Sequence, residues 1–319
     1  MPRKFDFDRR LLLDGGMGRE LLKRGVPILT DIWSGTALIE APQTVLAVHS
    51  DFIEAGADVI TTNTYGLARK RLAAAGAEDR FVELHRIAGE LAVQARSNAG
   101  RDVAIAGSLP PYSGSYRPDL VEPYEKLFPL YLEQAEALAP YVDLFICETM
   151  SSAAEGLAAA SAAVRIGKPV WVSWTLHDDR SGKLRSNETV TEAAAAIAHL
   201  PIAGFLVNCC SPESVSAAMP ALARIGRGKF GGYANTFLPV PENWGAYGGR
   251  KLDPSNWEEY AGTALPLRDD LDPPSFAAFA EPWLRQGASL LGGCCGAGPG
   301  HIARLRQVLD KEELTTKKR

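Results

Sequence analysis

Two adjacent cysteines, Cys294 and Cys295, stand between glycines in the segment Gly-Gly-Cys-Cys-Gly at residues 292–296. The apolar residues 288–291 before them are typical of a short buried strand. Because neighbouring side chains on a strand point to opposite faces, both thiols can approach one point only where the strand has ended. The flanking glycines allow that change of direction and leave room for a ligand beside the backbone. The spacing therefore predicts two thiols that converge at a strand end.

A third thiol, from Cys209 or Cys210, follows another apolar run at residues 203–207. Three thiolates from two strand ends predict a zinc site whose fourth position is open, as in catalytic sites. Zinc with three thiolates is a mild Lewis acid, and it suits a fourth, exchangeable thiolate that stays nucleophilic. We therefore expect a substrate thiolate to attack an electrophile, and methyl transfer fits well.

Other interpretations of the cysteines remain open at this point. All of them could be small buried apolar residues, which is the common fate of an isolated cysteine. Alternatively, Cys210 could close the fourth position and give a structural, non-catalytic zinc protein. Cys147, which lies inside another apolar run, is expected to belong to the core.

Eight short apolar runs recur along the chain, and helical patterns follow most of them. Continuous apolar runs suit parallel strands that are buried on both faces. Eight strand–helix units in roughly 300 residues predict an α/β fold, the (β/α)8 TIM barrel, with a doubly wound open sheet as the alternative. We expect one barrel domain over residues 1–309 and a flexible C-terminal tail over 310–319. The predicted strands are 11–13, 57–61, 102–107, 142–147, 169–174, 203–207, 229–233 and 288–291.

In such a barrel, polar residues just past the strands gather at one rim, where barrel enzymes place their active sites. The sixth and eighth strands both deliver cysteines to that rim, and only the seventh strand separates them. The long segment 236–274 is expected to form a lid or an interface, as long loops in compact domains usually do. The other predicted rim residues are Asp14, Thr62, Asn63, Ser108, Glu148, Thr175, Asn208 and Asn235.

The bulk composition favours an ordinary cytoplasmic protein. A net charge of −4 argues against a nucleic-acid or anionic-membrane partner. Five cysteines, an odd number with two adjacent pairs, do not resemble a disulfide framework. The charged N-terminus lacks the apolar stretch of a signal peptide, and the longest weakly polar stretch is too short to span a bilayer. The oligomeric state stays open, a homo-oligomer included.

The chain resembles the homocysteine S-methyltransferase family, which includes the betaine- and S-methylmethionine-dependent enzymes and the homocysteine module of cobalamin-dependent methionine synthase. The likeness covers nearly the whole chain, and its motifs together are highly specific. It implies a (β/α)8 barrel and a zinc ion held by three cysteines. The motifs are LLLDGGMGRELLKRG (11–25), HSDFIEAGADVITTNTY (49–65), GSLPPY (107–112), CETM (147–150), VNCCSPES (207–214) and GGCCGAGPGHI (292–302).

The resemblance assigns roles to five of these residues. The family's zinc cysteine after Val-Asn matches Cys209, and its adjacent pair matches Cys294 and Cys295. The choice of Cys209 over Cys210 rests on the motif, because the spacing does not decide it. The family's two acids match Asp14 and Glu148, which would hold the amino group of homocysteine, a role that suits carboxylates facing an ammonium. Taken alone, Asp14 could equally be a turn residue and Glu148 an acid at a helix start.

A cationic methyl donor is expected to bind against aromatic faces. Trp33 and Tyr65 lie where the betaine enzymes use aromatics, and Tyr112 and Tyr116 are further candidates. Thr149 stands where betaine enzymes carry an aromatic, so S-methylmethionine or S-adenosylmethionine is favoured over betaine as the donor. The predicted reaction methylates homocysteine to methionine. The alternatives are a betaine-type donor, and selenocysteine or another thiol as the acceptor.

Overall fold

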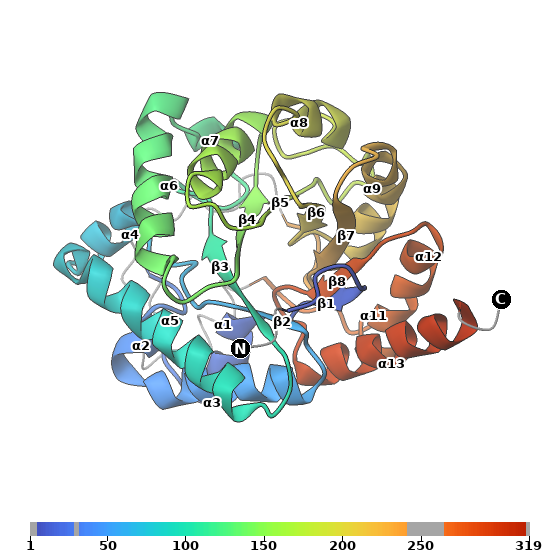
Figure 1. Ribbon diagram of the computed structural model, residues 1–319, viewed down its shortest axis with the longest axis horizontal. Helices are drawn as coiled ribbons and strands as arrows, with labels where there is room; N and C mark the ends of the chain where they lie inside the picture. The colour runs from blue at the N-terminus through green and yellow to red at the C-terminus, as the bar shows by residue number, and fades with distance from the viewer. Residues whose placement is uncertain (1–4, 29–31, 241–264, 317–319) are drawn as a thin grey trace.

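The computed structural model describes residues 5–28, 32–240 and 265–316. Eight parallel strands lie at the centre, and helices surround them (Figure 1). The sheet order is β1-β8-β7-β6-β5-β4-β3-β2. A parallel bridge between Leu13 and Val59 joins the first strand to the second, so the sheet closes into a nearly complete barrel. The strands are β1 (Leu11–Leu12), β2 (Val59–Thr61), β3 (Ala104–Leu109), β4 (Leu144–Met150), β5 (Val170–Trp174), β6 (Gly204–Asn208), β7 (Lys229–Ala234) and β8 (Leu290–Gly293).

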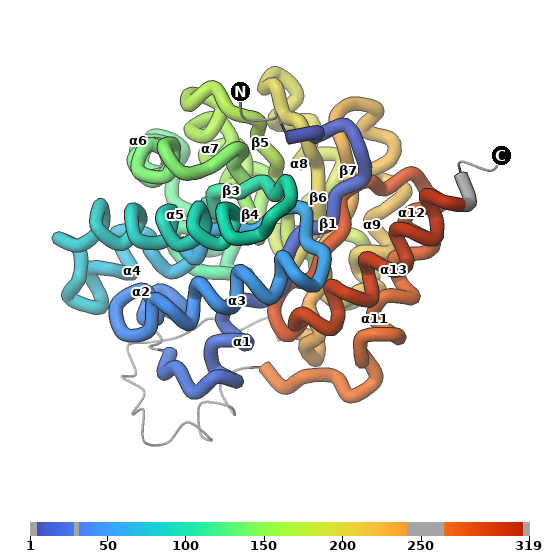
Figure 2. Tube along the Cα trace, turned by 60° about the horizontal axis from the view of Figure 1, so that its bottom comes forward, coloured from blue at the N-terminus to red at the C-terminus, as the bar shows by residue number. Residues whose placement is uncertain are grey.

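Helices follow the strands along the chain and wrap the barrel from outside (Figure 2). Short 3-10 helices, Glu78–Arg80 and Pro118–Leu120, interrupt two of the connections. The α-helices are α1 (Met17–Lys23), α2 (Thr36–Glu40), α3 (Pro42–Glu54), α4 (Arg69–Ala74), α5 (Phe81–Asn98), α6 (Tyr124–Leu138), α7 (Ala153–Val164), α8 (Val190–Ala196), α9 (Pro212–Arg224), α11 (Pro273–Ala278), α12 (Ala280–Arg285) and α13 (Pro299–Thr316).

The strands are buried on both faces and build two separate cores. Inward residues of alternating strand positions, such as Leu11, Ile146 and Leu206, fill the barrel interior. Their neighbours, such as Phe145 and Phe205, face outward and pack in the layer between the sheet and the helices. This arrangement explains the continuous apolar runs in the sequence, because neither face of a strand meets water.

The structure confirms the barrel and all eight predicted strands, with shifted ends. Strand β4 continues to Met150, so Glu148 lies within the strand and not just past it. Helix α13 continues to Thr316, so the described part of the segment 310–319, which was expected to be a flexible tail, is helical. Part of the segment 236–274, residues 241–264, lies outside the described residues. Among the residues that the structure describes, no helix combines the length and the apolar content that a membrane crossing requires.

Asp58 links several segments at the amino-terminal end of the barrel through hydrogen bonds and ion pairs. Its carboxylate is 3% exposed and accepts a hydrogen bond from the Leu12 N–H at 3.0 Å. The Arg9 guanidinium lies 2.8 Å from one carboxylate oxygen, and Arg306 of α13 bonds the other. Arg101 adds a weaker contact at 3.7 Å. One buried charge therefore joins the N-terminal segment, the loop before β3 and the last helix.

We expect Asp58→Asn to lower the free energy of unfolding by about 2–4 kcal/mol, because it leaves clustered arginines without their counter-charge. The value lies below that of a fully buried pair, since the arginines are partly exposed and solvent screens them. Chemical denaturation measures the effect. The matched control is Asp310→Asn, which removes an exposed partner of the same Arg306 and should change stability by less than about 0.5 kcal/mol. Equal effects at the two positions would contradict the role given to Asp58.

Candidate active site

Three thiols meet at the carboxyl end of the barrel. The Sγ atoms of Cys209, Cys294 and Cys295 lie within 4.8 Å of one another, and those of Cys209 and Cys295 are 3.7 Å apart. Cys209 follows the last residue of β6, and Cys294 follows the last residue of β8. The two strands flank β7, so the barrel brings the sixth and eighth strand ends together as the sequence analysis expected.

A left-handed turn selects Cys209 over Cys210. Leu206 faces the barrel interior and Val207 faces the helix layer, so regular alternation would place residue 210 on the interior side. Cys209 instead adopts a φ of 52°, a conformation that L-residues rarely take. The turn points its thiol toward Cys295, and Cys210 is buried in the core between sheet and helices. Cys210 therefore lies outside the thiol cluster.

Two glycines allow the backbone to approach the cysteine pair. A Cβ on Gly16 would lie 2.8 Å from the carbonyl oxygen of Cys294, too close for any side chain. Gly296, which follows the pair, has a φ of 83° and abuts the Thr236 side chain. The loop that carries Cys294 and Cys295 thus packs between the start of α1 and the segment after β7. The glycine at 296 serves the predicted change of direction, whereas Gly292 and Gly293 belong to β8.

An irregularity in β4 positions Glu148 beside the thiols. The register of β4 against β5 shifts between Cys147 and Met150, and Thr149 in between has a φ of 61°. Such a bulge adds one residue to the strand and redirects the side chains next to it. Asn208 fixes the bulge from β6: its side-chain oxygen accepts from the Thr149 N–H at 2.8 Å, and its amide donates to the Thr149 hydroxyl at 2.8 Å. Asn208 directly precedes Cys209, so the acid and the thiol are positioned together.

Two buried carboxyl groups lie at this rim. The Thr61 N–H and hydroxyl donate to the two Asp14 oxygens at 2.7 and 3.0 Å. Glu148 accepts from the Ser108 hydroxyl and, at 3.4 Å, from Tyr233. Burial raises the pKa of Asp14 to about 7, and the Glu148 charge adds to the shift. Burial likewise raises the pKa of Glu148 to about 7, with a contribution from Cys209. Both carboxyls therefore titrate near neutral pH.

The thiols of the cluster differ in their pKa values. Hydrogen bonds from Cys209 and Cys294 lower the pKa of Cys295 well below that of an ordinary thiol, and the Arg19 guanidinium contributes. The pKa of Cys294 moves in the opposite direction because that thiol donates to its neighbours. Arg19 donates to the Leu265 carbonyl at 2.6 Å and lies over the Phe237 ring. A positive charge thus lies near one side of the thiol cluster.

The candidate aromatic residues differ in their distance from this centre. The Tyr65 hydroxyl bonds Ser115 at 2.7 Å, and the charges of Cys209 and Glu148 influence its pKa, which burial raises well above 10. Trp33, with a φ of 48°, packs against Gly18 of α1. The Tyr116 hydroxyl lies 2.9 Å from the Cys209 Sγ.

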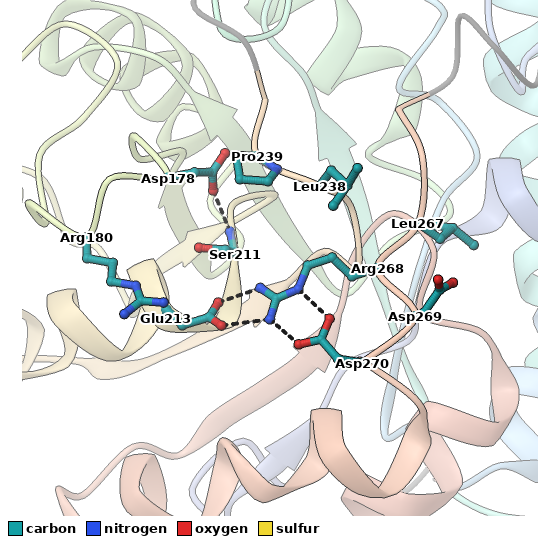
Figure 3. Close-up of a pocket in the computed structure, with 10 residues that line it drawn as sticks. All are labelled: Asp178, Arg180, Ser211, Glu213, Leu238, Pro239, Leu267, Arg268, Asp269 and Asp270. Atoms are coloured by element: carbon teal, nitrogen blue, oxygen red, sulfur yellow. Dashed lines mark hydrogen bonds and ion pairs between the residues drawn. The ribbon is translucent and has the colours of Figure 1, made fainter.

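A separate pocket of about 510 Å³ opens beside the start of α9 and holds none of the three thiols (Figure 3). Arg268 crosses it and binds Glu213 with two hydrogen bonds of 2.8 Å, and it also binds Asp270. At its edge Asp178 accepts from the Ser211 N–H at 2.7 Å. The ion pairs of Arg268 with Glu213 and Asp270 join the segment after β7 to the start of α9 on this side of the thiol site.

Sequence reasoning gave no role to three residues that contact this site. Asn208 was placed at the rim only, although its position before Cys209 was a usable signal. Tyr233 faces the barrel interior on β7, as period-two alternation along that strand could have indicated. Arg19 comes from the helix after β1, and no pattern in the sequence links it to Cys295.

The turn at residue 209 gives a test of the backbone geometry. In metal-free reduced protein, Cys209→Gly should be more stable than Cys209→Ala by about 1 kcal/mol, because glycine accepts a positive φ without strain. At Cys210 the order should reverse, since an ordinary backbone conformation makes glycine the costlier residue by about 0.4–1 kcal/mol. Urea denaturation of the four variants measures both differences. The same order at both positions would contradict the turn.

Comparisons with known proteins agree with this architecture. The family model for homocysteine S-methyltransferase matches residues 11–309. A homocysteine S-methyltransferase of Escherichia coli (strain K12) is 28% identical over 316 residues, which cover 93% of this chain and 94% of that protein. A selenocysteine Se-methyltransferase of Brassica oleracea var. italica is 26% identical over 327 residues, with 93% and 88% covered. The crystal structure of the homocysteine methyltransferase MmuM from Escherichia coli in its metallated form superposes with a TM-score of 0.76 at 28% identity, covering 95% of this chain and 97% of that one. The chain therefore belongs to the homocysteine S-methyltransferase family.

Proposed function

We propose that this methyltransferase transfers a methyl group from a sulfonium donor, S-methylmethionine or S-adenosylmethionine, to the sulfur of homocysteine, and that zinc on Cys209, Cys294 and Cys295 activates that sulfur. The convergence of the three Sγ atoms at the barrel rim is the observation that carries the proposal. Membership in the family supports homocysteine as the acceptor. A relative whose structure is known in a metallated form supports a metal in this chain as well.

The thiol cluster fits zinc. Tetrahedral zinc with Zn–S bonds of about 2.3 Å places its sulfurs about 3.8 Å apart. The Cys209 and Cys295 sulfurs are 3.7 Å apart. Soft thiolates favour zinc over hard cations such as magnesium, and three protein ligands leave one position for a substrate sulfur. When bound, zinc would supply the positive charge that keeps the substrate thiol ionised at neutral pH.

Asp14 and Glu148 are suited to holding the ammonium of homocysteine. Both are buried, and burial raises the pKa of each. Nearby negative charge adds to the shift, from Glu148 in the case of Asp14 and from Cys209 in the case of Glu148. A cation between them removes that penalty, so the ammonium and the two carboxylates stabilise one another. Thr61 and Ser108 orient the two carboxyl groups and, being neutral donors, leave their negative charge for such a partner. The amino acid is thereby oriented with its sulfur directed to the thiol cluster.

Tyr65 is proposed as one aromatic face for the cationic donor. It lies near Cys209 and Glu148, and an aromatic face attracts a sulfonium most strongly where water is excluded. Trp33 is proposed as a second face at the rim. The substrate thiolate then forms a new S–CH3 bond as the C–S bond of the sulfonium breaks, and the donor leaves as a neutral thioether. The thiol proton would be released to solvent when the substrate sulfur binds, so no general base would be required in the transfer step.

A second acceptor class follows from the relatives. Two of them are named for selenocysteine methylation, and a selenolate can replace a thiolate in the same displacement. An assay that pairs each of four donors (S-methylmethionine, S-adenosylmethionine, betaine and dimethylsulfoniopropionate) with homocysteine and with selenocysteine separates these choices. The ratio of kcat/KM values for the two acceptors decides between them.

Replacing one ligand tests the site directly. Cys294→Ala should lose bound zinc and methyl transfer by at least about 100-fold, because two thiolates no longer complete the site. The measurements are zinc content and the X-ray absorption sulfur count, which should rise from three to four when homocysteine is added to the parent protein. Cys210→Ala is the matched control and should retain zinc, since that thiol lies outside the cluster. Near-normal turnover by Cys294→Ala, or a sulfur count that homocysteine leaves unchanged, would contradict the proposal.

The two carboxyl groups predict the pH dependence of amino-acid binding. Their pKa values near 7 leave them largely neutral at pH 6, and a neutral carboxyl cannot pair with an ammonium. Affinity should therefore rise about tenfold between pH 6 and 8 for each carboxyl that must be ionised to bind the ammonium. Methionine is the probe for calorimetry, because its thioether does not ionise in this range.

Asp14→Asn should weaken methionine binding and flatten this profile. The matched control is Glu155→Gln. Glu155 is buried and its pKa is also raised to about 7, but its carboxylate accepts hydrogen bonds from Ser151 and is not one of the two proposed to hold the ammonium. This variant should keep the parent profile. A parent affinity that is constant from pH 6 to 8 would exclude the assigned role of the carboxyls.

A further inference from the structure

Tyr116 reaches the thiol cluster from the long loop between β3 and α6. Its side chain is 7% exposed, and its hydroxyl lies 2.9 Å from the Cys209 Sγ. A thiolate can only accept a hydrogen bond, so the phenol is the donor whenever Cys209 is ionised. Tyr116 has a φ of 63°, which a bulky residue rarely adopts without support from its surroundings.

That support comes from a buried cation. The Arg185 guanidinium lies 5.0 Å from the centre of the Tyr116 ring, and Arg185 is 6% exposed. Asp178 holds the guanidinium at 3.0 Å, and the Val240 carbonyl accepts from it at 3.2 Å. The other Asp178 oxygen accepts from the Ser211 N–H, two residues after Cys209 (Figure 3). One connected set of contacts therefore holds both the phenol and the chain that carries the thiol.

This arrangement affects which sulfur can react. A ligand thiolate and a substrate thiolate in one site are both nucleophiles, and a sulfonium donor could methylate either. Methylation of Cys209 would form an S–CH3 bond on the protein, break the donor's C–S bond, release a thioether and destroy a ligand. A hydrogen bond to a thiolate withdraws electron density and lowers its nucleophilicity. Of the three sulfurs, Cys209 is the one with a phenol hydroxyl at 2.9 Å among the contacts of the described residues, whereas Cys294 accepts a longer hydrogen bond of 3.9 Å from the Asn208 amide.

We propose that Tyr116 is a positioning residue that holds Cys209 as a metal ligand and suppresses its alkylation, so that the methyl group goes to the substrate sulfur. Arg185 against the ring makes the phenol a stronger hydrogen-bond donor, and it keeps the ring in place. The inference rests on the proposed zinc site. It goes beyond that site by naming the group that makes one of its three sulfurs different from the others.

The test uses Tyr116→Phe, which removes only the hydroxyl. In Co²⁺-loaded protein, the sulfur-to-cobalt charge-transfer band should move to longer wavelength, because the thiolate becomes richer in electrons. With zinc bound and no substrate, iodoacetamide should alkylate Cys209 about tenfold faster than in the parent, as peptide mass spectrometry reports. Cys294 and Cys295 should react at unchanged rates. Tyr131→Phe, a change at a buried phenol of α6 outside the cluster, should alter neither measurement.

Two results would overturn the inference. An unchanged charge-transfer band with unchanged alkylation would show that the hydroxyl does not influence the ligand. Equal acceleration at all three cysteines would show that the change merely opens the site. Arg185→Lys provides a second variant that retains the phenol and the charge, and it should shift both measurements less and in the same direction. A parent protein that binds no Co²⁺ through its thiols would contradict the proposed function itself. If Tyr116→Phe changes neither the charge-transfer band nor the alkylation rate of Cys209, only this inference is contradicted.

Discussion

Two strand ends can present three sulfurs to one point only where the backbone leaves regular β geometry. The chain does so at Cys209, which takes a left-handed conformation directly after β6, and at Gly296, which follows the cysteine pair after β8. A third left-handed residue, Thr149, lies in the bulge of β4. Backbone strain of this kind persists only where surrounding contacts fix it. Here the Asn208 side chain joins the bulge of β4 to the turn after β6, so the positions of Glu148 and Cys209 depend on each other.

Local chemistry explains why these elements form where they do. Ser211 accepts a hydrogen bond from the Ser214 N–H and Pro212 occupies the first turn, so α9 begins immediately after the turn that directs the Cys209 thiol to the cluster. On the other side, Gly16 lets the chain after β1 contact the loop of Cys294. The thiol cluster and the backbone beside it thus come from the short connections that leave β1, β6 and β8. The helices outside the barrel fix those connections by burying their apolar faces.

The sequence predicted the fold well because each strand is buried on both sides and leaves a continuous apolar run. It could not choose between Cys209 and Cys210 by periodicity, since a turn of one residue reverses the alternation. For the same reason Glu148 was expected past the strand, whereas the bulge keeps it within β4. The contact of Tyr116 with Cys209 and the position of Arg185 depend on how loops from different parts of the chain meet. Such contacts leave no local pattern, so only family motifs or coordinates reveal them.

The buried acids at the two ends of the barrel have different kinds of partner. At the amino-terminal end, Asp58 has three arginine partners within the chain, and its charge is satisfied by the fold itself. At the carboxyl end, the described hydrogen-bond donors to Asp14 and Glu148 are all neutral: the Thr61 backbone and hydroxyl, and the Ser108 and Tyr233 hydroxyls. Neutral donors orient a carboxylate but do not cancel its charge, so burial raises both pKa values toward 7. The free energy that an internal cation would have supplied is therefore available to a cation from outside, which supports the proposed binding of the homocysteine ammonium at this end.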